Sequence, residues 1–232
     1  AEWEPKKHII EKDKAKELGF FSPLNNKYIG IDWGYSAPFG AIWVEVTPKG
    51  KVLCYRELYG TEKHPQEWGE LISKHSQNED ITMSLGDPSM WTRNPMSWRK
   101  PESPMYADQS IAMALSGGDG SLVPNLSPAN NNRVNGWRNI AQKMHWNEKT
   151  EPNFYVLKGT CPNLVRTIPD MIFDDKRPED LDTTLEDHIL DALRYALTHS
   201  QSPTEVKAKS KDEIEYDKLI NPDPIGWNYD WS

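Results

Sequence analysis

The chain has 232 residues and a mass of 26.7 kDa, enough for one large domain whose core needs no disulfide or zinc site. Its 35 acidic residues outnumber its 27 lysines and arginines, and the resulting net charge of −8 excludes a uniformly basic nucleic-acid-binding protein. The chain has only two cysteines and no apolar run near the roughly 18 residues of a membrane helix, so we expect a reducing, cytosolic setting without a membrane span.

The acidic charge is concentrated in two segments. Residues 170–191 hold nine acids and two bases, and residues 200–232 hold seven acids and four lysines. The rest of the chain therefore carries a net charge of +2. Most of the molecule is close to neutral, and the acidity belongs to one internal stretch and one end.

The N-terminal part of the chain is expected to lead into a sheet. Residues 1–26 are charged and close with glycine and proline, which predicts a linker or lead-in. Runs of strand-forming residues follow at 28–32, 40–46 and 51–59, separated by turns rich in glycine and proline. Strands joined by such short turns pair with their neighbours, so we predict an antiparallel meander of three strands.

Beyond the meander, strands and helices alternate. The expected elements are a helix over 64–75, a strand over 80–86, a loop over 89–104, a helix within 105–115, a turn at 117–121, a helix over 135–146, a strand over 153–157 and a helix over 183–199. This order predicts an α/β domain over residues 27–199, in which helices flank a mixed sheet. The polar, acidic residues 200–232 are predicted to form a C-terminal tail.

Two aspartates follow predicted strands. Asp32 ends the first strand with the small residues Gly30 and Gly34 nearby, which leaves space around its carboxylate. Asp87 is the first polar side chain after strand 80–86, and Pro88 stops further pairing. Each aspartate, taken singly, also fits the simpler role of an acid that caps its own turn.

The helix over 183–199 has one apolar and one polar face. At 100° per residue, Asp187, His188 and Asp191 share the polar face. Like charges four residues apart destabilise a helix unless a cation lies nearby, and Arg194 or a bound metal could supply that cation. The alternative is an ordinary solvated helix face.

Carboxylates that meet from separate elements repel one another unless divalent cations lie between them. Hard oxygen ligands suit Mg²⁺ or Mn²⁺, and two such ions activate a water and stabilise the leaving oxygen of a phosphodiester displacement. The pattern therefore indicates hydrolysis of nucleic acid.

Three motifs carry a family resemblance. The sequences GIDWG (Gly30–Gly34), GDP (Gly86–Pro88) and DHILDALRY (Asp187–Tyr195) resemble the nuclease domain of tailed-bacteriophage large terminase subunits. The resemblance covers about residues 27–199 and implies an RNase H-like fold, with an antiparallel three-strand meander and parallel strands in one sheet. It also implies that Asp32, Asp87 and Asp191 are the catalytic, metal-binding acids, with His188 as a partner and Asp187 as a possible fourth acid.

The implied activity is that of a metal-dependent, largely sequence-nonspecific endonuclease, which uses two Mg²⁺ or Mn²⁺ ions to cut concatemeric viral DNA during genome packaging. By the same resemblance, the expected partners are double-stranded DNA, a terminase ATPase domain, the small terminase subunit and the portal, in the cytoplasm of an infected bacterial host. The chain has no Gly-x-x-x-x-Gly-Lys-Ser/Thr motif, so ATP binding is not expected of it.

Contact with DNA is expected to be weak. Residues 87–149 contain seven bases and five acids, and the best candidates for phosphate contacts are Arg93, Arg99 and Lys100, with Arg138 as a further one. The first three alternate with tryptophans, which also fits an exposed loop with aromatic anchors.

Two other functions remain open at this point. One is a different RNase H-like nuclease, such as a junction resolvase, which would prefer branched DNA. The other is a non-catalytic module that docks on the portal or motor and keeps its acids only as a remnant.

Overall fold

The computed structural model describes residues 3–92, 110–170 and 186–198. The chain divides into a compact unit of residues 1–201 and a second unit of residues 202–232, which lies outside the described residues. The predicted tail therefore lies outside them as well, as does most of the loop expected over 89–104.

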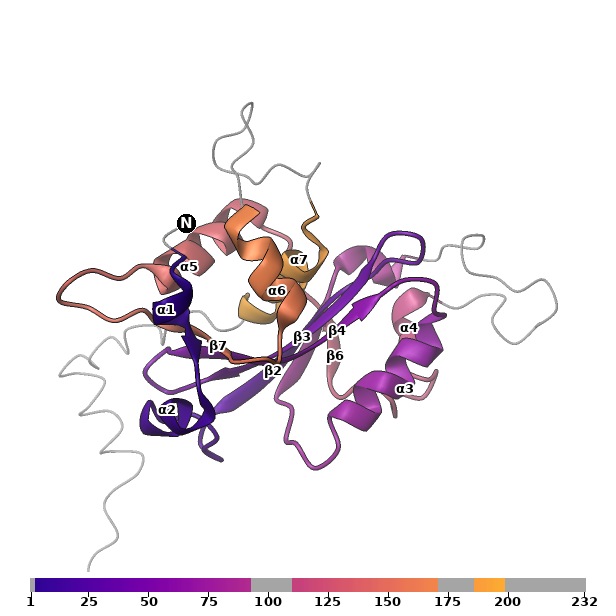
Figure 1. Cartoon of the computed structure of the whole chain (residues 1–232). Coiled ribbons are helices and arrows are strands. Elements are labelled where there is room, and N and C mark those ends of the chain that lie inside the picture. Colours follow the sequence, from indigo (N-terminus) through magenta and orange to yellow (C-terminus); the bar gives the residue numbers. More distant parts are fainter. Residues whose placement is uncertain (1–2, 93–109, 171–185, 199–232) are drawn as a thin grey trace, which may run out of the picture. The chain divides into compact units, whose positions relative to one another are not determined.

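One seven-stranded sheet forms the centre of the first unit, in the order β1-β7-β4-β3-β2-β5-β6 (Figure 1). The strands are β1 (Ile9–Ile10), β2 (Asn26–Asp32), β3 (Phe39–Val46), β4 (Val52–Gly60), β5 (Met83–Gly86), β6 (Leu126–Pro128) and β7 (Phe154–Leu157). Strands β2, β3 and β4 pair antiparallel, whereas β5 pairs parallel with β2 and β7 pairs parallel with β4. The predicted meander and mixed sheet are thus confirmed.

Helices cover both faces of this sheet. They are α1 (Pro5–His8), α2 (Lys12–Glu17), α3 (Pro65–His75), the 3-10 helix η1 (Pro88–Trp91), α4 (Ile111–Leu115), α5 (Arg133–Met144), α6 (Pro162–Thr167), the 3-10 helix η3 (Ile168–Asp170) and α7 (His188–Leu197). Helices α5, α6 and α7 share one hydrophobic cluster with the sheet, and α2, α3 and α4 share a second cluster on the other face (Figure 1).

Residues 3–26, expected to be a lead-in, contribute α1, β1 and α2. Strand β1 pairs parallel with β7 at the sheet edge, and the His8 imidazole is fully buried with its Nε2 atom 3.0 Å from the Met144 carbonyl oxygen. A strand of two residues has no alternation that sequence reasoning could detect. The limits proposed for the nuclease domain, residues 27 and 199, stay a prediction.

Several other elements differ from expectation in length or existence. The short elements β6 and α6 were not predicted, strand β5 begins only at Met83, and α7 begins at His188 rather than five residues earlier. Helix α4 begins at Ile111, where the Ser110 side chain accepts a hydrogen bond from the Met113 amide as an N-cap.

The two faces of β2 carry different side chains, as strand alternation requires. Ile29 and Ile31 are buried in the cluster beneath α3 and α4, whereas Tyr28 belongs to the cluster of α5, α6 and α7. Gly30 lies on this second face, and a Cβ atom there would lie 1.8 Å from the Ala192 carbonyl oxygen of α7. The absence of a side chain thus lets the backbone of α7 lie directly on β2.

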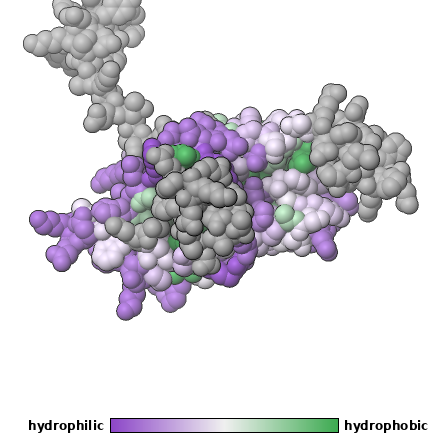
Figure 2. All heavy atoms as spheres, turned by 90° about the horizontal axis from the view of Figure 1, so that it is seen from above, coloured by the Kyte–Doolittle hydropathy of each residue, from purple (hydrophilic) through white to green (hydrophobic). Residues whose placement is uncertain are grey.

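The described surface on the side shown in Figure 2 is mostly hydrophilic, and its apolar residues form small separate spots. Among the described residues, no helix is long and apolar enough to cross a membrane.

Candidate active site

The first two aspartates of the site meet at one edge of the sheet. Ile31 of β2 pairs with Gly86 of β5, so these parallel strands end side by side. Asp32 is the last residue of β2, and Asp87 follows β5 directly, with its amide donating to the Ile31 carbonyl at 3.3 Å. The carboxyl ends of parallel neighbours lie at the same edge, which brings both aspartates there.

Helix α7 brings the third and fourth aspartates over this edge. Asp187 occupies the N-cap position, and Asp191 lies in the first turn. Gly40 of β3 gives the helix further room, because a Cβ atom there would lie 3.2 Å from the His188 carbonyl oxygen. The His188 Nδ1 atom lies 2.9 Å from Asp32 Oδ2, so the start of α7 is joined to the end of β2.

Asp191 is held by two arginines. Arg194, one turn further along α7, donates from Nε to Asp191 Oδ1 at 2.9 Å. Arg133, the first residue of α5, donates from Nη1 to Asp191 Oδ2 at 2.8 Å and reaches Asp187 Oδ2 at 3.5 Å through Nη2. The cation expected beside the two like charges of α7 is therefore a pair of guanidinium groups.

Asp87 has two partners of its own. Its Oδ1 accepts a hydrogen bond from the Ser89 amide at 2.6 Å, so this aspartate does cap its own turn. Its Oδ2 accepts a hydrogen bond from the buried Tyr195 hydroxyl at 2.8 Å. Tyr195 lies one turn beyond Asp191, so one helix face contacts both strand ends.

Neighbouring acids contribute to the raised pKa values of Asp32 and Asp187. Burial is the main cause that raises the pKa of Asp32 to about 6, and the charges of Asp191 and Asp87 add to it, whereas the bond from His188 opposes it. Burial and the charge of Asp191 likewise raise the pKa of Asp187. The hydrogen bond to Asp32 raises the pKa of His188. The site thus holds negative charge that its own residues only partly compensate.

The donor set suits a hard divalent cation, because it consists of carboxylates from separate elements. Asp32, Asp87 and Asp191 are the residues that the sequence predicts as its ligands. Among the described residues, however, no three His, Cys, Asp or Glu side chains are arranged so that they could hold a metal ion. Oxygens of all three carboxylates are instead engaged by His188, Tyr195, Ser89 and the two arginines.

Two residues of this site were not assigned a role from the sequence. Tyr195 could have been found, because it follows Asp191 by four residues and so shares its helix face. Arg133 could not, because it lies 58 residues from Asp191 in the sequence and no local pattern links them.

The predicted DNA contacts are described only in part. Arg93, Arg99 and Lys100 lie outside the described residues. Arg138 is exposed on α5, the helix that begins with Arg133.

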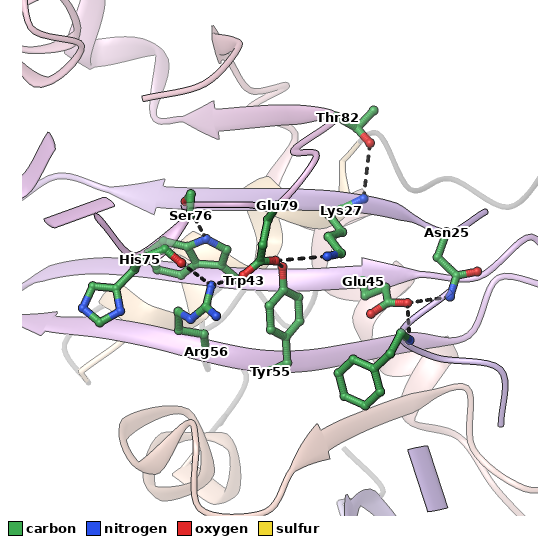
Figure 3. A network of polar contacts seen from close by, with 11 residues as sticks. Asn25, Lys27, Trp43, Glu45, Tyr55, Arg56, His75, Ser76, Glu79 and Thr82 are labelled. Atoms are coloured by element: carbon green, nitrogen blue, oxygen red, sulfur yellow. Dashed lines mark hydrogen bonds and ion pairs between the residues drawn. The ribbon is translucent and has the colours of Figure 1, made fainter. Parts of the chain in front are cut away.

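A second polar cluster, centred on Glu79, lies on the opposite face of the sheet. Figure 3 shows Tyr55, Arg56 and Lys27 around Glu79, with Tyr55 Oη at 2.7 Å and Lys27 Nζ at 3.2 Å from Glu79 Oε2. These donors lower the pKa of Glu79 against the opposing effect of burial. The Glu79 carboxylate thus links β2 and β4 to the segment that follows α3, and we assign it a structural role.

Comparison with known proteins rests on structure. No protein-family model matches the sequence, and no curated protein matches it. Among solved structures, the P22 large terminase nuclease domain matches with a TM-score of 0.59 and 14% identity, covering 85% of this chain and 89% of that one. The large terminase of a thermophilic bacteriophage matches with a TM-score of 0.58 and 20% identity over 85% of this chain.

The sheet topology and these structural matches show that the chain has an RNase H-like α/β fold. Within that class, the structural match is to the nuclease domain of large terminases. The chain covers 44% of the thermophilic-phage terminase, so it corresponds to less than half of that longer protein.

Proposed function

We propose that the chain is a metal-dependent, largely sequence-nonspecific DNA endonuclease that cuts concatemeric viral DNA during genome packaging. The observation that carries the proposal is the meeting of Asp32, Asp87 and the first turn of α7 at one edge of an RNase H-like sheet. The likeness of the fold to terminase nuclease domains supports the same activity.

The proposed residues have distinct roles. Asp32, Asp87 and Asp191 bind Mg²⁺ or Mn²⁺, of which two ions would supply an activated water and a counter-charge for the leaving oxygen. His188 holds Asp32 in place through its Nδ1 atom. Asp187 is a further acid at the N-cap of the same helix.

The proposed partners are those that the resemblance to large terminases implies. Double-stranded DNA is the substrate, and a terminase ATPase domain, a small terminase subunit and the portal are the protein partners, in the cytoplasm of an infected bacterium. The thermophilic-phage terminase is more than twice as long as the part that this chain covers, which supports association with a further domain. Arg138, with Arg93, Arg99 and Lys100, is proposed to contact phosphates.

A plasmid assay tests the activity. The purified chain is incubated with supercoiled plasmid and Mn²⁺ or Mg²⁺, with chelator as a control. We expect cleavage that depends on the ion, and loss of at least about 100-fold in rate for Asp32→Asn, because a metal ligand is removed. Asp80→Asn makes the same change at an exposed position outside the site and serves as the matched control.

Equal cleavage by the wild type and Asp32→Asn would contradict the proposed mechanism. A strong preference for a four-way DNA junction over the plasmid would favour a resolvase instead. Absence of any ion-dependent cleavage would favour the docking module.

A further inference from the structure

The two arginines that contact Asp191 differ in how deeply their side chains are buried. The Arg194 side chain has no exposed area, and Gly136 of α5 makes room for it, since a Cβ atom there would lie 2.5 Å from Arg194 Cγ. The guanidinium carbon lies 4.3 Å from the centroid of the Tyr195 ring and 5.5 Å from that of Trp137. Arg194 is thus a fixed part of the core.

Arg194 gives only part of its hydrogen-bonding capacity to Asp191. Its Nη1 and Nη2 atoms are buried and have no hydrogen-bond partner in the part of the chain that the structure describes. Burying unpaired donors costs free energy. The ion pair between Arg194 Nε and Asp191 Oδ1 offsets part of that cost. Arg194 would therefore lose its hydrogen bond to a charged partner if it left Asp191 Oδ1.

Arg133 is placed differently. It is the first residue of α5, and 25% of its side chain is exposed to solvent. Its two terminal nitrogens contact Asp191 and Asp187 from outside α7, in the position that a cation between these acids would take. A partly exposed arginine on a flexible stem can leave such a pair at far lower cost than a buried one.

The formal charge of the site depends on whether Arg133 is present. Four aspartates and two arginines leave a formal charge of −2 when the aspartates are ionised, which one divalent ion balances. Departure of Arg133 frees Asp191 Oδ2 and leaves −3, so two divalent ions and one DNA phosphate would then balance the site.

We propose that Arg133 is an exchangeable internal cation, which holds Asp191 and Asp187 in the metal-free protein and which a divalent metal must displace from Asp191. The inference rests on the proposed function. It adds that Arg133 competes with the metal ion for Asp191 and so controls when the metal site can form. The displaced guanidinium is then available to a DNA phosphate.

Binding of Mn²⁺ to the metal-free chain, measured by calorimetry without DNA, tests this competition separately from cleavage. We expect Arg133→Gln to bind Mn²⁺ about tenfold more tightly than the wild type, because the ion no longer displaces a charge-assisted hydrogen bond. Lys149→Gln removes the same charge from an exposed position outside the site, and its affinity should stay within about twofold of wild type, because surface charges are largely screened.

A variant that retains the charge covers the case in which Arg133→Gln does not fold. Arg133→Lys keeps one positive charge but loses the two-armed guanidinium, so its Mn²⁺ affinity should also exceed that of the wild type. Thermal unfolding adds a second readout: the melting temperature of Arg133→Gln should lie below wild type without metal and rise more when Mn²⁺ is added.

Equal Mn²⁺ affinity for the wild type and both Arg133 variants, together with weaker binding by Asp191→Asn, would overturn the inference and leave the proposed function standing. Absence of Mn²⁺ binding by the wild type and all variants would overturn the proposed function as well.

Discussion

Asp32 carries its charge at a cost, because its carboxylate is nearly buried beside two other acids. Its pKa of about 6 in the folded chain lies above the ordinary value of 3.8. A raised carboxyl pKa means that the folded state binds the proton more tightly, so this group's contribution to stability falls as the pH rises through that interval. The position is thus unfavourable for stability at neutral pH without a cation.

We therefore predict that Asp32→Asn raises the free energy of unfolding of the metal-free protein at pH 7 to 8, by about 1–3 kcal/mol. The gain should shrink as the pH falls from 6 toward 4 and be absent below it, because Asp32 is then protonated in both states. Urea unfolding at several pH values measures this. An undiminished gain at pH 4, or a loss at pH 7, would contradict the assignment.

Tyr195 is a positioning residue for Asp87, since its buried hydroxyl donates to Asp87 Oδ2. Tyr195→Phe keeps the ring and removes that hydrogen bond. We expect kcat for plasmid cleavage to fall about tenfold, as is usual for groups that orient a metal ligand, with KM for the plasmid within about twofold. A change in KM alone would show that the hydroxyl serves DNA binding instead.

At the scale of elements, the site depends on how closely α7 lies on the sheet. Gly30→Ala would place a Cβ atom 1.8 Å from the Ala192 carbonyl oxygen, and neither backbone can yield easily. We predict a loss of about 3 kcal/mol or more in the free energy of unfolding. Denaturant unfolding measures it, with Gly60→Ala as the comparison.

Gly60 is a suitable comparison because its Cβ atom would meet only the edge of the Trp68 ring, at 3.2 Å. A side chain can yield there, so the loss should be about 1 kcal/mol. Equal losses in the two variants would show that α7 does not lie on β2 as described.

The Glu79 network ties β2 and β4 to the segment after α3 (Figure 3). Glu79→Gln should lower the free energy of unfolding by about 2–3 kcal/mol at pH 7, because Arg56 and Lys27 lose a partly buried partner. The lowered pKa of Glu79 means that its stabilisation is present above 4.5 and is lost as the pH falls, so the difference between wild type and variant should shrink below that pH. A difference independent of pH would contradict the role of the charge.

At the scale of the whole molecule, the sequence predicted those strands and helices that are long enough to show a pattern of apolar and polar residues. Runs of strand-forming residues between glycine- and proline-rich turns were sufficient to predict the meander, and the period of α7 was sufficient to predict its polar face. The segments β1 and β6 escaped prediction because two or three residues carry no period.

The sequence predicted the acids of the site and, beside them, His188 and Arg194. Asp32, Asp87 and Asp191 follow from strand ends and one helix face, and the fold brings them to one edge. Arg133 could not be predicted, because its contact with Asp191 depends on how α5 packs beside α7. Whether these acids share a metal ion stays a prediction.

The proposed function depends above all on a divalent metal at one edge of this sheet. A crystal of the chain soaked in Mn²⁺, with anomalous diffraction recorded at the manganese edge, tests it most directly. We predict an anomalous peak within coordination distance of Asp32, Asp87 and Asp191, with Arg133 moved away from Asp191 Oδ2. A soaked crystal of an active preparation that shows manganese elsewhere, with all three carboxylates unligated, would contradict it.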